Sequence, residues 1–251
     1  MLTGRVKIWL RVGIAYMRTF RGVRCDILDA SKTVDAIVAG KSLIRFGDGE
    51  FGIYRGKDIH YQPCSERLQA DFRRIKDDFE GAGQHGPFLL AVPRKYMLCT
   101  GLELGRRRVL VSSWAESRLY FKTRFSRQVT YGDSFLFERK NKDIYSRIWR
   151  QPGDARTIVF VHNNPRYAEV FGRTYGRKVL YVACPAYDAF RQVDMIMENI
   201  GRTVAENGIG PKDVQMVISA GPAGKVIAYR LSNEGYHCID AGHCWDDPLE
   251  S

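Results

Sequence analysis

The feature that most constrains the fold of this chain is an alternation, after residue 40, between short apolar segments and longer mixed ones. Apolar segments rich in β-branched residues predict strands, and the strongest three cover 157–161, 178–182 and 214–218. Further strand candidates cover 42–46, 87–92 and 108–111. The clearest helix is expected from about Tyr187 to Glu206, where apolar residues recur at helical spacing. This pattern predicts a Rossmann-like α/β fold, with a mostly parallel sheet and helices on both faces.

Sheets of this kind bind ligands at the carboxyl ends of their strands. In the segment SLIRFGDGEFG (42–52), a predicted strand runs directly into an acidic turn that contains Asp48 and Glu50. In an extended backbone these two residues would project to the same side. Two close carboxylates repel each other unless a cation lies between them, and a hard divalent ion, Mg²⁺ or Mn²⁺, would fit there. A solvated acidic turn is the alternative interpretation.

The C-terminal segment 213–243 indicates a strand, a glycine turn, a helix and a second short strand. Gly221 ends the first strand, Pro222 suits the first helical turn, and Gly224 allows close approach of the backbone. The free N–H groups at the helix start would form an anion site suited to a diphosphate, to which Lys225 could add a cation. An ordinary strand-to-helix turn would have a similar sequence, because the P-loop and dinucleotide-binding glycine patterns are absent.

Two histidines follow predicted strands. His243 comes after Asp240 and two small residues, at the same edge of the sheet as the glycine turn. His162 ends the strand at 157–161, precedes two asparagines, and is expected to line the cleft. The patterns HExxH and GxSxG and the kinase motifs are absent, so a metalloprotease, a serine hydrolase and a protein kinase are unsupported.

The net charge of +11 is concentrated at the N-terminus. Residues 1–24 contain no acid and six cations: Arg5, Lys7, Arg11, Arg18, Arg21 and Arg24. A protein that binds nucleic acid through a globally basic surface is therefore disfavoured. Residues 1–24 are predicted to form a basic amphipathic segment, whose apolar face would contain Ile8, Trp9, Val12, Tyr16 and Phe20. Such a segment suits an anionic membrane surface but is too interrupted by arginine to span a membrane; a helix packed on the domain is the alternative.

Residues 25–251 are predicted to form a single domain, because no repeat, linker or low-complexity tract divides them. The six cysteines are scattered without a CxxC pair, which favours reduced thiols in a cytoplasmic protein and gives no zinc pattern. With the N-terminal segment, the expected location is the cytoplasm or, peripherally, the inner face of the plasma membrane.

Three segments together resemble a known family: FGDGEF (46–51), CPAYDAF (184–190) and SAGPAGKVIAYRLSNEGYHCIDAGH (219–243). They are similar, in this order, to bacterial glycosyltransferases of the GT-D fold, a family first described as a domain of unknown function. The likeness covers about residues 40–245. It implies a GT-D-type domain in which a DxE motif engages a divalent metal and the diphosphate of a nucleotide sugar.

The resemblance assigns roles to individual residues. The implied reaction moves a sugar from a nucleotide sugar, with UDP as the expected nucleotide, to a glycan, glycoprotein or lipid-linked acceptor. The implied ligands of Mn²⁺ or Mg²⁺ are Asp48, Glu50 and His243. Asp188 and Asp240 are candidates to accept the proton of the acceptor hydroxyl. The expected donor-binding residues are Arg45, Gly47, Gly221, Pro222, Gly224 and Lys225.

The chain also departs from the family pattern. Ala223-Gly224-Lys225 stands where the family has a threonine-rich stretch, Asp188 stands where it has asparagine, and Cys244-Trp245-Asp246-Asp247 follows the D-x-G-H match. These departures affect the prediction of the donor sugar and the acceptor more than the prediction of the reaction class.

Two other functions compete with the transferase. A non-catalytic adapter could bind anionic membrane or nucleic acid through the basic clusters at 106–108 and 118–127. A phosphoryl-transfer or nucleotide-sugar-modifying enzyme could use a similar sheet. The combination of the DGE turn with the D-x-G-H end favours the transferase, and no nucleic-acid partner is expected.

Overall fold

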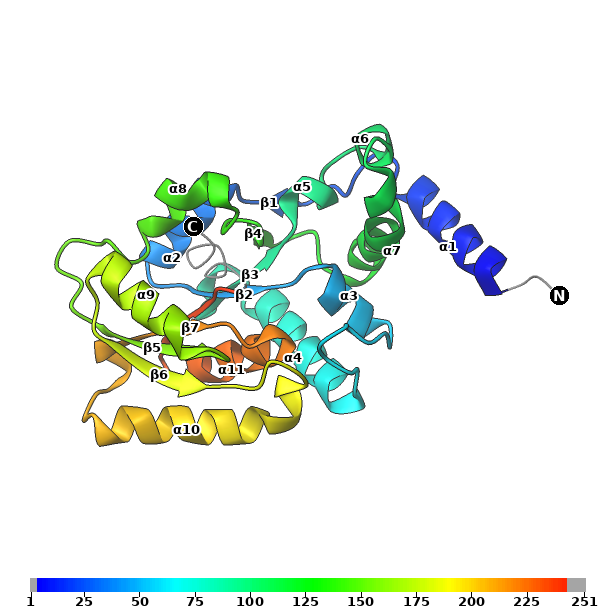
Figure 1. The fold of residues 1–251 in the computed structure, drawn as a ribbon. Coiled ribbons are helices and arrows are strands. Elements are labelled where there is room, and N and C mark those ends of the chain that lie inside the picture. The colour runs from blue at the N-terminus through cyan, green and yellow to red at the C-terminus, as the bar shows by residue number, and fades with distance from the viewer. Residues whose placement is uncertain (1–3, 243–251) are drawn as a thin grey trace.

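The computed structural model describes residues 4–242. Eight strands form one sheet in the order β1-β4-β3-β2-β8-β7-β5-β6, and each pair of neighbouring strands is parallel (Figure 1). The strands are β1 (Asp26–Ile27), β2 (Ser42–Arg45), β3 (Phe88–Val92), β4 (Thr130–Asp133), β5 (Thr157–His162), β6 (Val179–Ala183), β7 (Val214–Ile218) and β8 (His237–Asp240).

Helices connect the strands and cover the sheet (Figure 1). The α-helices are α1 (Gly4–Arg18), α2 (Ala30–Val38), α3 (Asp48–Tyr54), α4 (Glu66–Ala82), α5 (Arg94–Met97), α6 (Gly101–Gly105), α7 (Arg108–Arg124), α8 (Lys142–Ser146), α9 (Pro165–Tyr175), α10 (Val193–Glu206) and α11 (Gly221–Asn233). The 3-10 helices are η1 (Gly83–His85), η2 (Arg139–Asn141), η3 (Ala189–Gln192) and η4 (Pro211–Asp213).

The central strands are buried on both faces. Successive strand residues point to opposite sides of a sheet, and here they enter two different apolar clusters. Leu43 packs in the cluster that contains side chains of α2, α8 and α9, whereas Ile44 packs in the cluster that contains side chains of α4, α10 and α11. This arrangement explains the continuous apolar segments and confirms the predicted α/β fold with helices on both faces.

The structure corrects three details of the prediction. Residues 108–111 are not a strand, because they form the first turn of α7, whose later residues Trp114 and Phe121 are buried in the core. The two short strands β1 and β4 were not predicted, since neither has a continuous apolar run. The helix expected from about Tyr187 begins as η3, and α10 starts only at Val193.

The N-terminal segment packs on the domain through its C-terminal half. Val12 and Ala15 are buried against Ala115 of α7. Arg118, from one of the basic clusters considered for nucleic acid, is fully buried and donates hydrogen bonds to the carbonyls of Thr19 (2.6 Å) and Cys99 (2.7 Å). Arg118 is therefore unable to contact a nucleic acid. None of the helices within residues 4–242 has the length and apolar character needed to cross a membrane.

Candidate active site

A cavity of about 780 Å³ opens at the carboxyl ends of the central strands. Residues that follow β2, β4, β5, β6, β7 and β8 line it. The connections diverge at the junction of β5 and β7, since the chain leads from β5 to β6 on one side and from β7 to β8 on the other, and residues after both strands line the cavity. Such a switch point is where open α/β sheets bind ligands, and the volume suits a small-molecule site.

The predicted acidic turn is the start of helix α3. Gly47 is the N-cap residue, and its N–H donates a hydrogen bond to Oε2 of Glu50 at 2.7 Å. Asp48 and Glu50 are thus in a helical first turn, and the expectation of an extended backbone that projects both side chains to one side is wrong. Glu50 is buried and lines the cavity, whereas Asp48 is exposed beside it.

A buried lysine connects the acidic turn to the end of β8. Nζ of Lys225 lies 3.5 Å from Oε1 of Glu50 and 3.2 Å from Oδ2 of Asp240. The main-chain N–H of Arg45 donates to Oδ2 of Asp240 (3.0 Å), and its Nε donates to the Asp240 carbonyl (2.7 Å). We refer to Arg45, Glu50, Lys225 and Asp240 as the carboxyl-edge cluster. It joins β2, α3, α11 and β8 with two cations and two carboxylates.

The charges of this cluster keep Lys225 protonated. Burial alone lowers the pKa of Lys225, but the carboxylates of Asp240 and Glu50 outweigh burial and raise the pKa above its ordinary value. The pKa of Asp48 is also raised, first because the neighbouring protein removes water from its carboxylate and second because of the charge of Glu50. Negative charge at Asp48 is therefore only partly balanced by the protein.

Helix α11 begins at the cavity wall, as its sequence predicts. Gly221 and Pro222 line the cavity, while Gly224 packs the helix on β7, where an added Cβ would lie 3.1 Å from Ile218. Gly221 has φ +53° and faces Tyr61, whose ring an added Cβ would approach to 2.9 Å. Ser219, just before the helix, also lines the cavity, and its buried hydroxyl has no hydrogen-bond partner among the described residues. The helix start thus offers N–H donors and a hydroxyl to an anion.

The two candidate proton acceptors are held by other residues. Asp240 is almost fully buried and is engaged by Lys225 and Arg45. Asp188 has φ 49°, and its Oδ1 accepts a hydrogen bond from Nε2 of Gln62 at 2.7 Å. Neither carboxylate is part of the described cavity lining.

Other lining residues complete the site. Arg45 and Gly47 line the cavity, and His162 with Asn163 and Asn164 confirms the expectation from their position after a strand. Sequence reasoning missed Tyr61, Gln62 and Glu138, which come from loops that carry no strand-end motif. Gly242 is required for packing, because its φ is +56° and an added Cβ would lie 2.1 Å from Nη2 of Arg45.

A divalent cation would find part of a ligand set here. Asp48 offers an exposed carboxylate, whereas the oxygens of Glu50 already face the Gly47 N–H and Lys225. Within residues 4–242, no three His, Cys, Asp or Glu side chains gather into a metal-binding group, and the expected ligand His243 lies outside that range. The described residues fit an ion that takes most of its ligands from phosphate and water, as Mg²⁺ does.

Comparisons with known proteins identify the family of the chain. A family model described as "Glycosyltransferase GT-D fold" matches residues 43–247. The chain is 23% identical over 237 residues to "Probable glycosyl transferase Gly" of Streptococcus gordonii, a match that covers 87% of this chain and 32% of that protein. It is 24% identical over 234 residues to "Glycosyltransferase GlyD" of Streptococcus pneumoniae, with 84% and 26% covered. The chain thus spans about a third or less of the length of these relatives.

Solved structures share the fold. One, described as a highly conserved domain of unknown function 1792 with a distinct glycosyltransferase fold, superposes with a TM-score of 0.71 at 18% identity and covers 96% of this chain and 84% of that one. Another, described as a new glycosyltransferase from Streptococcus sanguinis, has a TM-score of 0.70 at 22% identity, with 90% and 84% covered. Since the family model spans most of the sequence, from β2 past β8, the chain belongs to the glycosyltransferase GT-D fold family.

Proposed function

We propose that this chain is a metal-dependent glycosyltransferase that moves a sugar from a nucleotide sugar, with UDP as the nucleotide, to a hydroxyl of a glycan, a glycoprotein or a lipid-linked acceptor. The observation that carries the proposal is the cavity at the carboxyl ends of the central strands, which brings a helix N-terminus and a buried lysine next to an acidic helix start. The names of the relatives support the reaction class. The free thiols of the five described cysteines support the proposal of a cytoplasmic location.

The donor diphosphate would bind at the start of α11. When the bond between the anomeric carbon and the diphosphate oxygen breaks, its electron pair stays on the diphosphate, and the site must stabilise this charge. The N–H groups after Gly221, the hydroxyl of Ser219 and the ammonium of Lys225 are the groups available to do so. Lys225 has a second effect, because it holds Glu50 and Asp240 in place while it faces the cavity.

A divalent ion would be held by Asp48, with Glu50 beside it, and His243 stays a proposed third ligand. When bound, Mn²⁺ or Mg²⁺ would supply positive charge to the diphosphate leaving group. The role of the chain is to present Asp48 in the first turn of α3, which the Gly47–Glu50 hydrogen bond fixes.

The proton of the acceptor hydroxyl needs a carboxylate with access to the cavity. Asp188 and Asp240 are engaged by other side chains and do not line the cavity, so we assign them positioning roles. Glu138 lines the cavity, is half-buried and pairs with Lys140 (2.6 Å). We propose it as the group that accepts this proton while the acceptor oxygen attacks the anomeric carbon. Glu138→Gln should then lower kcat about 100-fold and leave the KM for the donor unchanged.

The test is a screen of nucleotide sugars for Mn²⁺-dependent transfer or donor hydrolysis. Asp48→Ala and Glu50→Ala should abolish the activity found with the wild type, whereas Glu198→Ala, which removes an exposed carboxylate from α10, should retain it. If the wild type neither binds nor hydrolyses any nucleotide sugar, the transferase proposal fails and the adapter becomes the better interpretation. If Asp48→Ala keeps full metal-dependent activity, the metal role of Asp48 is wrong.

A further inference from the structure

Helix α1 is apolar on two faces, and only one of them packs on the domain. Val12 and Ala15 form the buried face, against α7. The predicted single apolar face is therefore divided, since Val12 and Tyr16 point to the domain while Ile8 and Trp9 stay exposed at 58% and 66%. Figure 1 shows α1 extending past α7 at the margin of the molecule.

The outward face is a continuous apolar stripe. Val6, Leu10, Ile14 and Met17 are 45–69% exposed, and their spacing places them on one side of the helix, opposite Val12 and Ala15. Of the nine large apolar side chains that are exposed among the described residues, six are on α1. This concentration on one 15-residue helix marks an interaction surface.

The charges around the stripe indicate what covers it. Lys7 and Arg18 flank the stripe, and Arg21 and Arg24 follow the helix, all of them exposed. Residues 1–24 contain no acid to pair with them. A second copy of this chain would bring these like charges together, which disfavours a dimer through α1. An anionic lipid surface matches both the apolar stripe and its cations, and tryptophan beside such a stripe is typical of the membrane interface.

We propose that the outward face of α1, formed by Val6, Trp9, Leu10, Ile14 and Met17 with Lys7 and Arg18 beside it, docks on an anionic membrane surface. The helix would lie in the plane of the interface, since its inner face stays on α7. Glu116 of α7 connects α1 to helix α3 of the site, because it pairs with Arg11 of α1 (3.0 Å) and with Arg55 at the end of α3 (2.9 Å). This proposal does not rest on the proposed function. If that function holds, docking of α1 would bring the cavity near a lipid-linked acceptor.

The test is sedimentation of the full chain with phosphatidylcholine vesicles that contain about one-third phosphatidylglycerol. The wild type should bind these vesicles and not pure phosphatidylcholine, and about 0.5 M salt should release it. Leu10→Glu/Ile14→Glu should weaken binding at least about tenfold, and Lys7→Ala/Arg18→Ala about tenfold. Met195→Glu is the matched control, because Met195 is also half-exposed but lies on α10, and it should bind like the wild type.

Tryptophan fluorescence gives a second readout that does not depend on the folding of these variants. Among the tryptophans within residues 4–242, Trp114 and Trp149 are buried, whereas Trp9 is 66% exposed. Anionic vesicles should therefore shift the emission to the blue in the wild type and not in Trp9→Phe. The proposal is overturned if the wild type does not bind anionic vesicles, if Leu10→Glu/Ile14→Glu binds them equally well, or if that pair of changes only dissolves a dimer. Donor binding is measured in the same samples. If donor binding is retained while vesicle binding is absent, the membrane proposal fails and the transferase proposal does not.

Discussion

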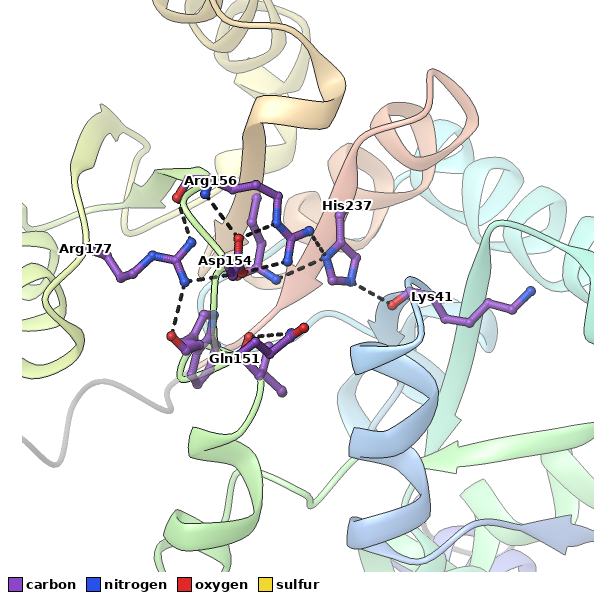
Figure 2. Close-up of polar contacts among 9 residues, drawn as sticks. Lys41, Gln151, Asp154, Arg156, Arg177 and His237 are labelled. Carbon is purple, nitrogen blue, oxygen red and sulfur yellow. Dashed lines mark hydrogen bonds and ion pairs between the residues drawn. The ribbon is translucent and has the colours of Figure 1, made fainter.

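The two edges of the sheet each contain a cluster of charged residues, and the clusters differ in whether their charged groups face the cavity. The amino-edge cluster, shown in part in Figure 2, consists of Asp154, Arg156, Arg177, Gln215 and His237. Asp154 accepts hydrogen bonds from the Nε and Nη2 of Arg156 and lies 3.3 Å from Arg177. Arg156 and Gln215 both reach Nδ1 of His237, whose Nε2 donates to the Lys41 carbonyl at 3.1 Å. Oε1 of Gln215 is buried without a described partner, but no residue of this cluster lines the cavity.

At the carboxyl edge, by contrast, charged and polar groups face a cavity. Lys225 faces the cavity as well as two carboxylates, Ser219 has a hydroxyl without a described partner, and Asp48 is exposed with a raised pKa. A buried polar group without a partner destabilises a protein unless a ligand completes it. The comparison indicates that the amino edge holds the fold together, whereas the carboxyl edge presents groups to a ligand.

The largest effect should come from Asp48→Asn, which removes the partly unbalanced charge at the cavity. We expect kcat/KM for donor and acceptor to fall about 1,000-fold. The thermal unfolding temperature should stay within about 2 °C of the wild type, because Asp48 is exposed. A variant that loses its fold along with its activity would contradict the separation between the two edges.

Asp154→Ala should have the opposite profile. It leaves Arg156 and Arg177 without their carboxylate, and the free energy of unfolding should fall by about 3 kcal/mol. Denaturant unfolding measures this loss, and calorimetry should show donor affinity unchanged in the folded fraction. Equal loss of donor affinity would mean that the amino-edge cluster also shapes the site.

His237 should make the amino edge sensitive to acid. Burial, followed by the charge of Arg156, lowers the pKa of His237 to about 4 in the folded chain, below its usual 6.5. The unfolded chain then binds a proton more readily, so stability is present above pH 6.5 and is lost as the pH falls toward 4. The free energy of unfolding should fall by about 3 kcal/mol from this residue. His237→Gln should flatten the pH dependence of unfolding between these values, and an unchanged slope would count against the assignment.

Ser219→Ala should have the smallest effect and sharpen the comparison. If the Ser219 hydroxyl binds the donor, the change should weaken donor binding about fivefold, or about 1 kcal/mol. The free energy of unfolding should be unchanged or slightly higher, because the change removes a buried hydroxyl without a described partner. The matched control is Ser232→Ala, whose hydroxyl is buried in α11 and bonded to the Tyr229 carbonyl; it should lower stability and leave donor binding unchanged.

Much of the fold could be predicted because the strands of a two-sided sheet are apolar throughout. Five of the six proposed strand segments exist, and the unit β7-α11-β8 follows its glycine, proline and apolar pattern. The segment 108–111 has the same local composition as a strand, and only the tertiary packing of Trp114 and Phe121 makes it helical. The short strands β1 and β4 are stabilised by pairing with neighbouring strands, and no local sequence pattern predicts this pairing.

The site was predictable where its residues follow strands, and not elsewhere. Glu50, Gly221 and Lys225 meet at the cavity because parallel strands end at one edge. The sequence could not show that Lys225 lies between Glu50 and Asp240, because that contact depends on the register between β2 and β8. Tyr61, Gln62 and Glu138 come from loops whose course is set by tertiary contacts, such as the bond from Gln62 to Asp188.

The most direct test of the account is calorimetric titration of UDP, GDP, dTDP and CMP, each with Mn²⁺, into the wild type, Asp48→Asn and Asp154→Ala. The account predicts that the wild type binds UDP best, that Asp48→Asn binds it at least about tenfold more weakly, and that folded Asp154→Ala binds it like the wild type. Absence of nucleotide binding to the wild type, or equal affinity in the wild type and Asp48→Asn, would contradict the claim that the carboxyl edge is a metal-assisted nucleotide-sugar site.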